Sequence, residues 1–241
     1  MTRSVCTSGA QQAGVRVISA IGMRDVIADL KSDFTAASGH TLTASAVETG
    51  EIKRRVRAGE PFDVMVVPRD AAEELEKQGR VASGAVPLVR VNFGLAVRAD
   101  EPSPDTRTPE ALRRTLLAAR RVLITDPATG GISGVHLMAV LEALGIAEVM
   151  KAKLVPLRGG GSHAARVVNR EGDLAVQAEH EIRAVAGATF LAYPAEFQRS
   201  VVFVAGIGTA SPNPAAGESF IAFMRGPRAT AAIEARGLTR A

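Results

Sequence analysis

Short apolar runs of strand length are followed, three times in the first half of this chain, by stretches with helical spacing. The strands are expected at residues 15–18, 42–46 and 62–67, and the helices at residues 23–38, 50–58 and 70–79. Gly39 is expected to end the first helix, and Asp70 to be the N-cap of the third. Strands alternating with helices predict a parallel α/β layer, in which ligands bind beyond the carboxyl ends of the strands.

This pattern is interrupted after residue 85 and then resumes. Residues 86–97 are expected to form two short strands, and residues 100–109 a proline-rich loop. A second α/β series follows, with strands at residues 122–125, 154–156, 174–176 and 201–204 and helices at residues 132–144, 163–169 and 214–235. The second half therefore repeats the architecture of the first.

The two series predict an α/β protein with two lobes. Lobe I is expected to comprise residues 14–90 and 202–241, with the C-terminal helices packed on it, and lobe II to comprise residues 91–201. Residues 1–13 are small and polar, and we expect a flexible arm there. The chain would cross between the lobes near residues 88–95 and 195–203, and a hinge of two crossings allows closure around a ligand.

The amino-acid composition and the charge exclude some classes of protein. The chain is 46% hydrophobic and 22% charged, with a net charge of +4, which is an ordinary globular balance. The densest basic cluster, Lys53 to Arg55 with Arg57, lies on a predicted helix and is interpreted as a solvated helix face. With no Trp and one Tyr, the chain lacks stacking aromatics, so we expect no nucleic-acid partner.

The cysteine and histidine content argues against a metal site or a bound cofactor, and we expect neither. Cys6 is the only cysteine, which excludes an internal disulfide, and the four histidines match no zinc-ligand spacing. No run reaches the roughly 20 apolar residues of a spanning helix. The first residues, MTRSVCTSGAQQAG, lack the apolar core of a secretory signal. The protein is therefore cytoplasmic if the sequence is complete, unless a signal was removed.

Four strand-to-helix junctions are rich in small and hydroxylated residues: residues 19–23, 48–50, 126–134 and 159–163. The first N–H groups of a helix have no partner within it, and the helix dipole favours negative charge there. Glycine allows close approach of a ligand, and Ser or Thr adds a donor. Any one junction by itself is explained better by ordinary turns and caps. Four of them at the same edge of two lobes predict a cleft that binds a small anion.

The order of these motifs resembles that of the molybdate-binding periplasmic proteins and the wider group of type II solute-binding proteins. The corresponding stretches are VRVISAIGMRDVIADLKSDFTAASGH, TGEIKRRVRAGEPFDVMVVPRD, TDPATGGISGVHLMAVLEALGI and FIAFMRGPRATAAIEARGL. The resemblance spans residues 15–238. It implies a periplasmic binding protein type II fold of Venus-flytrap shape, a periplasmic location and delivery of the ligand to an ABC permease.

The ligand pocket of those proteins differs from this sequence at three positions. Their serine before the first helix corresponds to Gly22, and their second serine to Glu48 or Thr49. Their tyrosine after the last strand of the second lobe corresponds to Ala178. An ionised Glu48 would repel a bound dianion, so the resemblance does not carry molybdate over to this chain.

One branch of the same group includes an aconitate isomerase, which makes an enzyme a second hypothesis. Moving a double bond requires a group that removes a proton and returns it elsewhere. Glu48 or His163 is the candidate base, and Arg69 would pair with a substrate carboxylate. Each residue also has an ordinary alternative role. Glu48 could interact with the N-terminus of its own helix, and His163 could be an exposed residue of a first helical turn. Arg69 could form a surface ion pair with Asp70 or Glu73.

The leading hypothesis is a monomeric, non-catalytic receptor for a small oxyanion or carboxylate. An isomerase and a cytoplasmic sensor that acts by the same closure are the alternatives. The residues expected to line the cleft are Gly22, Met23, Glu48, Thr49, Gly50, Arg69, Thr129, Ser133, Gly161, Ser162, His163 and Gln177.

Overall fold

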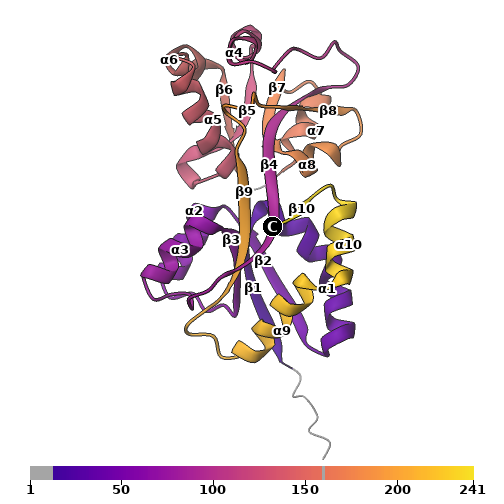
Figure 1. The fold of residues 1–241 in the computed structure, drawn as a ribbon. Helices are drawn as coiled ribbons and strands as arrows, with labels where there is room; N and C mark the ends of the chain where they lie inside the picture. Colours follow the sequence, from indigo (N-terminus) through magenta and orange to yellow (C-terminus); the bar gives the residue numbers. More distant parts are fainter. Residues whose placement is uncertain (1–12, 159–160) are drawn as a thin grey trace, which may run out of the picture.

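The computed structural model describes residues 13–158 and 161–241. Its described strands form a mixed sheet in the order β2-β1-β3-β9-β4-β7-β5-β6, and β8 and β10 both pair with β4. The sheet is divided between two lobes stacked end to end (Figure 1). Residues 1–12, which include Cys6 and nearly all of the expected N-terminal arm, lie outside the described residues.

Lobe I contains the first three strands as a parallel layer, with β1 in the middle. Its first elements are β1 (Gly14–Ala20), the 3₁₀ turn η1 (Ile21–Met23), α1 (Arg24–Ser38), β2 (Thr41–Val47), α2 (Thr49–Arg57), β3 (Val64–Pro68) and α3 (Arg69–Lys77). Gly39, with φ 73°, ends α1 in the left-handed region, as expected. Asp70 is not the N-cap of α3: Pro68 occupies that position, and Asp70 lies in the first turn.

The C-terminal part of the chain completes lobe I. It comprises β9 (Ser200–Ile207), α9 (Pro214–Arg225), α10 (Pro227–Ala235) and β10 (Thr239–Arg240). Phe34 of α1 is fully buried, and its ring meets that of Phe220 of α9 edge-on, with the ring centres 5.3 Å apart. The C-terminal helices therefore pack on lobe I.

Lobe II repeats the parallel arrangement, with β5 between β6 and β7. Its elements are α4 (Pro109–Ala118), β5 (Val122–Thr125), η2 (Pro127–Thr129), α5 (Ile132–Ala143), α6 (Ala147–Met150), η3 (Lys151–Lys153), β6 (Leu154–Leu157), α7 (His163–Val168), β7 (Leu174–Ala178), α8 (Glu179–Arg183) and β8 (Ala188–Ala192). Helix α4 was not expected. The Thr108 hydroxyl caps it by accepting from the N–H of Ala111, and Pro109 is its first residue.

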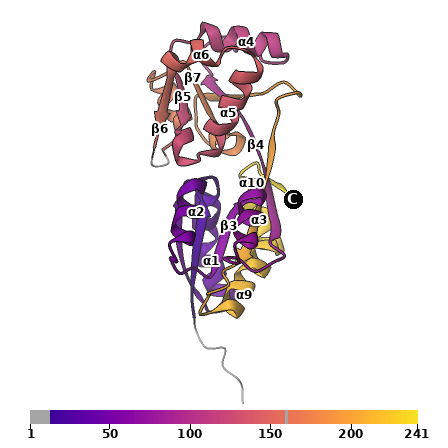
Figure 2. The ribbon, with the colours of Figure 1, turned by 90° about the vertical axis from the view of Figure 1, so that its left-hand side faces the viewer.

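The lobes are joined by two long strands (Figure 2). Residues 86–98 form one continuous strand, β4, so the prediction of two short strands is wrong. Its residues 86–92 pair with β9, and its residues 93–98 pair with β7 and β8 of lobe II. A single strand serves both sheets because its neighbours change along its length, and no turn is needed. Among the described helices, none is long and apolar enough to cross a membrane.

Candidate functional site

Among the described residues, a larger and a smaller cavity lie between the lobes. The larger, of about 1100 Å³, opens between α2 and α3 of lobe I and η2 and α5 of lobe II; we call it the outer cleft. The smaller, of about 50 Å³, is bounded by Val91, Phe93 and Phe203 of the hinge strands; we call it the deep pocket. Four residues line both: Ile21, Glu48, Thr49 and Ile132. The deep pocket is therefore the inner end of the outer cleft.

Helices from both lobes begin at the deep pocket. Thr49 is the first residue of α2 in lobe I, and Ile132 and Ser133 begin α5 in lobe II. Each helix follows the carboxyl end of a strand of a parallel layer, which places its unpaired N–H groups at the cleft. The convergence of two positive helix ends favours a negatively charged or acceptor-bearing guest.

The hydroxyl groups of the deep pocket differ in whether they have a hydrogen-bond partner. Ser133 Oγ lies 2.9 Å from Thr125 Oγ1, so each hydroxyl has a partner. Thr49 is 7% exposed, and its Oγ1 has no hydrogen-bond partner within the described part of the chain. A buried hydroxyl without a partner is costly. Thr49 therefore has an unused donor at the wall of the pocket.

The glycines at the start of α5, Gly131 and Gly134, have a structural role. A Cβ on Gly134 would lie 1.9 Å from the carbonyl oxygen of Thr125, and a Cβ on Gly131 would lie 2.2 Å from the Thr125 side chain. The start of α5 therefore packs directly against the end of β5, which brings Ser133 to Thr125. The sequence analysis did not single out Thr125, although it is the last residue of a predicted strand.

His163 is a buried imidazole at the wall of the deep pocket. Its Nδ1 lies 3.4 Å from the carbonyl oxygen of Val176. A carbonyl only accepts, so Nδ1 carries the hydrogen and Nε2 is left as an acceptor. Burial lowers the pKa of His163, and the hydrogen bond to Val176 opposes this effect. Gln177 also lines the pocket, and its Oε1 accepts from the N–H of Ala164 at 3.1 Å.

Two carboxyl groups line the deep pocket, Glu48 from lobe I and Glu181 from lobe II. Burial raises the pKa of Glu48, and the nearby charge of Asp126 raises it further. Among the described residues, no hydrogen bond engages the Glu48 carboxyl. Burial raises the pKa of Glu181 to about 7, against the backbone hydrogen bond from Ala178. Glu181 was not predicted from the sequence; it lies three residues after the end of β7.

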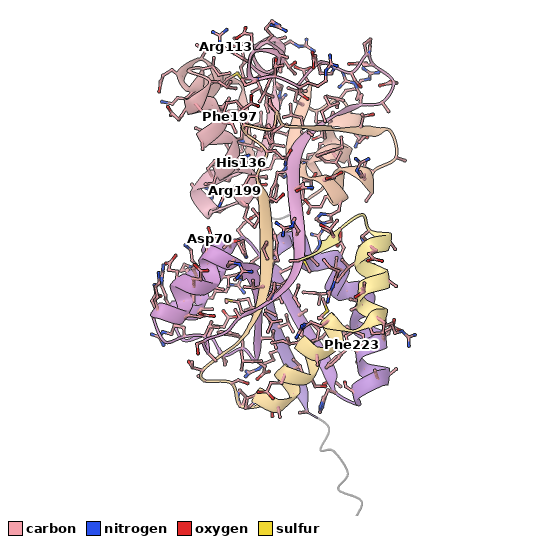
Figure 3. The ribbon with its side chains drawn as sticks, viewed as in Figure 1. Asp70, Arg113, His136, Phe197, Arg199 and Phe223 are labelled. Carbon is pink, nitrogen blue, oxygen red and sulfur yellow. The ribbon has the colours of Figure 1, made fainter. Side chains whose placement is uncertain are left out.

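The outer cleft has a different electrostatic character. Its basic residues are Arg24, Lys53, Arg54, Arg57, Arg158 and Arg199, and its acidic residues are Glu48, Glu51, Asp70 and Glu74. Arg158 Nε lies 2.6 Å from Asp126 Oδ2 within lobe II. Arg199 reaches toward lobe I, where its Nη2 lies 3.8 Å from Oδ2 of Asp70 (Figure 3). Each of the six basic side chains has a carboxylate partner. The lining of the outer cleft thus has a small excess of basic over acidic side chains, and a loose ion pair spans it.

The structure brings most of the expected site residues to the cleft. The deep pocket is lined by Gly22, Glu48, Thr49, Ser133, Gly161, His163 and Gln177, and the outer cleft by Glu48, Thr49, Gly50 and Thr129. Three residues lie elsewhere. Met23 is fully buried in the core because it faces away from the cleft. Arg69 is exposed and lines neither cavity.

The third residue outside the cavities is Ser162, whose side chain is used locally. Its Oγ accepts from the N–H of Ala165 at 3.1 Å and caps α7. Gly159 and Gly160 of the same junction lie outside the described residues. Across residues 13–158 and 161–241, no group of three His, Cys, Asp or Glu side chains is placed to hold a metal ion.

Comparison with known proteins places this architecture in a family. The model of bacterial extracellular solute-binding proteins matches residues 15–239. The chain belongs to this family. Among curated relatives, this solute-binding protein is 28% identical over 232 residues to an aconitate isomerase from a Pseudomonas species, covering 92% of this chain and 86% of that protein. It is 27% identical over 235 residues to the molybdate-binding protein ModA of Azotobacter vinelandii, covering 95% and 90%.

Solved structures agree on the fold. The periplasmic molybdate-binding protein of Azotobacter vinelandii matches with a TM-score of 0.72 at 22% identity, over 93% of this chain and 98% of that one. The predicted periplasmic binding protein fold, with two α/β lobes and a two-strand hinge, is confirmed. The resemblance to molybdate-binding proteins and aconitate isomerase noted in the sequence is confirmed as well.

Proposed function

We propose that this solute-binding protein captures a small anion, an oxyanion or a carboxylate, by closing its two lobes around it. The observation that carries the proposal is the orphaned hydroxyl of Thr49, buried at the wall of a cavity that both lobes line. A ligand that accepts hydrogen bonds from the Thr49 hydroxyl and from the backbone N–H groups at the starts of α2 and α5 would contact both lobes at once. Contacts available only in the closed form shift the population toward closure.

The proposed ligand-binding residues are those at the two cavities. Gly22, Thr49, Ser133, Gly161 and Gln177 would surround the group in the deep pocket, and Gly50 and Thr129 would contact the ligand at its entrance. The protein would act as a monomer in the periplasm and deliver the ligand to an ABC permease. Its membership of the extracellular solute-binding family supports the location, and the fold that it shares with the substrate-binding domain of a molybdenum ABC transporter supports the delivery. No resident cofactor is part of the proposal.

Thermal unfolding and isothermal titration calorimetry test this function directly. A ligand that binds only the folded state raises the unfolding midpoint by mass action, and the ligand is recovered unchanged. The screen comprises molybdate, tungstate, sulfate, and di- and tricarboxylates. We expect at least one anion to stabilise the wild type and to reduce its radius of gyration in X-ray scattering. No stabilisation by any of these anions would contradict the proposal.

An isomerase is the second candidate, because Glu48 and His163 line the same deep pocket and an aconitate isomerase is among the relatives. In this reaction Glu48 or His163 would remove a proton from one carbon of the substrate, the double bond would shift, and the proton would be returned to another carbon. Interconversion of cis- and trans-aconitate, followed by ultraviolet absorbance, tests it. Glu48→Gln and His163→Ala should each reduce the rate at least about a hundredfold if both groups take part. A receptor shows no turnover.

A further inference from the structure

We propose that the deep pocket selects a weakly acidic group that shares a proton with Glu48 and Glu181, and that the preferred ligand is an organic polycarboxylic acid. Permanent dianions such as molybdate and sulfate are rejected. This inference rests on the proposed function and names the ligand class of the same site.

The first argument is the distribution of charge between the two cavities. The described residues lining the deep pocket include Glu48 and Glu181 but no Lys or Arg. The outer cleft, in contrast, has six Lys and Arg side chains against four Asp and Glu side chains. Like charges close together in a poorly solvated site repel strongly. The two glutamates therefore oppose a fully ionised group in the deep pocket, against the attraction of the starts of α2 and α5. The excess of basic side chains favours such a group in the outer cleft.

The second argument is that two polar side chains of the deep pocket, His163 and Gln177, offer no free hydrogen to a ligand. The Nε2 of His163 is an acceptor, because Nδ1 donates to Val176. The Gln177 side chain is engaged with Ala164 and with Glu181. A carboxylic acid group supplies the missing proton as a donor, while its carbonyl oxygen can accept from Thr49. Sulfate and molybdate at neutral pH can only accept.

The two carboxyl groups are held in surroundings that favour a shared proton. The charge of Arg24 stabilises the ionised form of Glu181, and the charge of Asp25 opposes it. Hydrogen bonds from Gln177 and from the N–H of Ala178 also favour the ionised form. The negative charge of Asp126, from lobe II, acts on Glu48 and disfavours its ionised form. His163 has Arg166 on its own helix, which disfavours a charged imidazole. The proton is therefore best placed between a ligand oxygen and one of the two glutamates.

The third argument is size. A volume of about 50 Å³ accommodates a group of a few non-hydrogen atoms, since a water molecule occupies ~30 Å³ in the liquid. The outer cleft, of about 1100 Å³, has room for the remainder of a longer ligand. Additional carboxylates of that ligand would meet Arg158 and Arg199 at the mouth. A polycarboxylic acid fits both the acidic inner end and the basic outer end.

Calorimetry with succinate, propane-1,2,3-tricarboxylate, hydrogen phosphate, sulfate and molybdate at pH 6 and pH 8 tests the inference. We expect the wild type to bind the carboxylates at least tenfold more tightly at pH 6 than at pH 8. Titrations in two buffers of different ionisation enthalpy should show net proton uptake on binding. Sulfate and molybdate should bind at least a hundredfold more weakly than the tightest carboxylate. Preferential binding of hydrogen phosphate would show that the ligand is a proton-bearing oxyanion, and it would overturn the assignment of a carboxylic acid.

Glu48→Gln and Glu181→Gln should each reduce the pH dependence and improve sulfate or molybdate binding about tenfold, because one repulsive charge is removed. Glu142→Gln, an exposed position on α5, is the matched control and should behave as the wild type. If Glu181→Gln does not fold, the pH dependence and the sulfate and molybdate affinities of Glu48→Gln decide whether the inference holds. Tight, pH-independent binding of molybdate or sulfate by the wild type would overturn this inference and leave the proposed receptor intact. Absence of binding by every anion would overturn the proposed function itself.

Discussion

Gly50 and Gly130 meet backbone to backbone across the cleft. A Cβ on Gly50 would lie 2.4 Å from the carbonyl oxygen of Thr129, and a Cβ on Gly130 would lie 2.9 Å from Cα of Gly50. Gly50 belongs to α2 of lobe I, and Gly130 follows η2 of lobe II with φ 74°. Any side chain at Gly50 would therefore have to displace the opposing backbone of lobe II.

The first prediction concerns this contact. Gly50→Ala should keep the lobes apart and weaken ligand binding by about tenfold or more, ~1.4 kcal/mol, while α2 itself gains helix propensity. X-ray scattering with saturating ligand should show a larger radius of gyration than for the wild type. Gly14→Ala, whose Cβ would meet only Thr41 Oγ1 at 3.4 Å, is the control. An unchanged affinity in Gly50→Ala would show that closure does not depend on this contact.

The second prediction separates a binding role of Thr49 from a structural one. Thr49→Val removes a buried hydroxyl that has no partner among the described residues, so the free energy of unfolding should stay equal or rise by about 1 kcal/mol. Anion affinity should fall by about tenfold or more. Thr115→Val is the comparison, because Thr115 Oγ1 donates to the carbonyl of Asp105 at 2.9 Å and its loss should cost about 1 kcal/mol. A stability loss in Thr49→Val with unchanged affinity would argue for a structural role.

The third prediction uses His180, whose Nε2 lies 3.0 Å from the carbonyl oxygen of Gly22 in the other lobe. Burial lowers the pKa of His180, and the hydrogen bond to Gly22 opposes this. Below pH ~6.5 the unfolded chain takes up a proton that the folded protein does not, so stability decreases as pH falls. The wild type should lose stability relative to His180→Gln between pH 7 and pH 5. Urea unfolding at each pH measures the free energy of unfolding of both proteins. The prediction is contradicted if this free energy changes with pH equally in the wild type and in His180→Gln.

The fourth prediction tests the packing of the C-terminal helices on lobe I. Phe34 is fully buried between the rings of Phe220 and Phe223, with ring centres 5.3 and 5.5 Å away. Phe34→Ala should lower the free energy of unfolding by about 3–5 kcal/mol because it leaves a cavity. Phe34→Leu should cost about 1.5 kcal/mol or less. A loss under about 1 kcal/mol in Phe34→Ala, measured by urea unfolding, would show that α9 is not held by this contact.

Much of the architecture was readable from local patterns. Helix α1 shows its buried face at helical spacing, from Val26 to Phe34, and Gly39 marks its end. The apolar run that became β3 is buried at every position, as expected for a strand covered on both faces. The junction at Glu48 and Thr49 was also identified, because both lie between a predicted strand and a predicted helix. These features depend on neighbours in the sequence.

Other features depended on partners far along the chain. Residues 86–98 have the composition of two strands, and only pairing with β9, β7 and β8 made them one. Met23 and Gly22 are adjacent, yet Met23 enters the core and Gly22 the deep pocket. Glu181 gained its raised pKa from burial between the lobes, for which its own helix carries no pattern.

The sequence by itself thus determined most of the elements, the two-lobed class and the junctions where a ligand could bind, because periodicity records which face of each element is buried. The tertiary structure alone decided which junction residues meet across the cleft, that Glu48 and Glu181 share one pocket, and that the basic residues gather outside it. Burial and charge interactions are set by the distances between elements that fold from separate parts of the chain, and no local pattern records those distances.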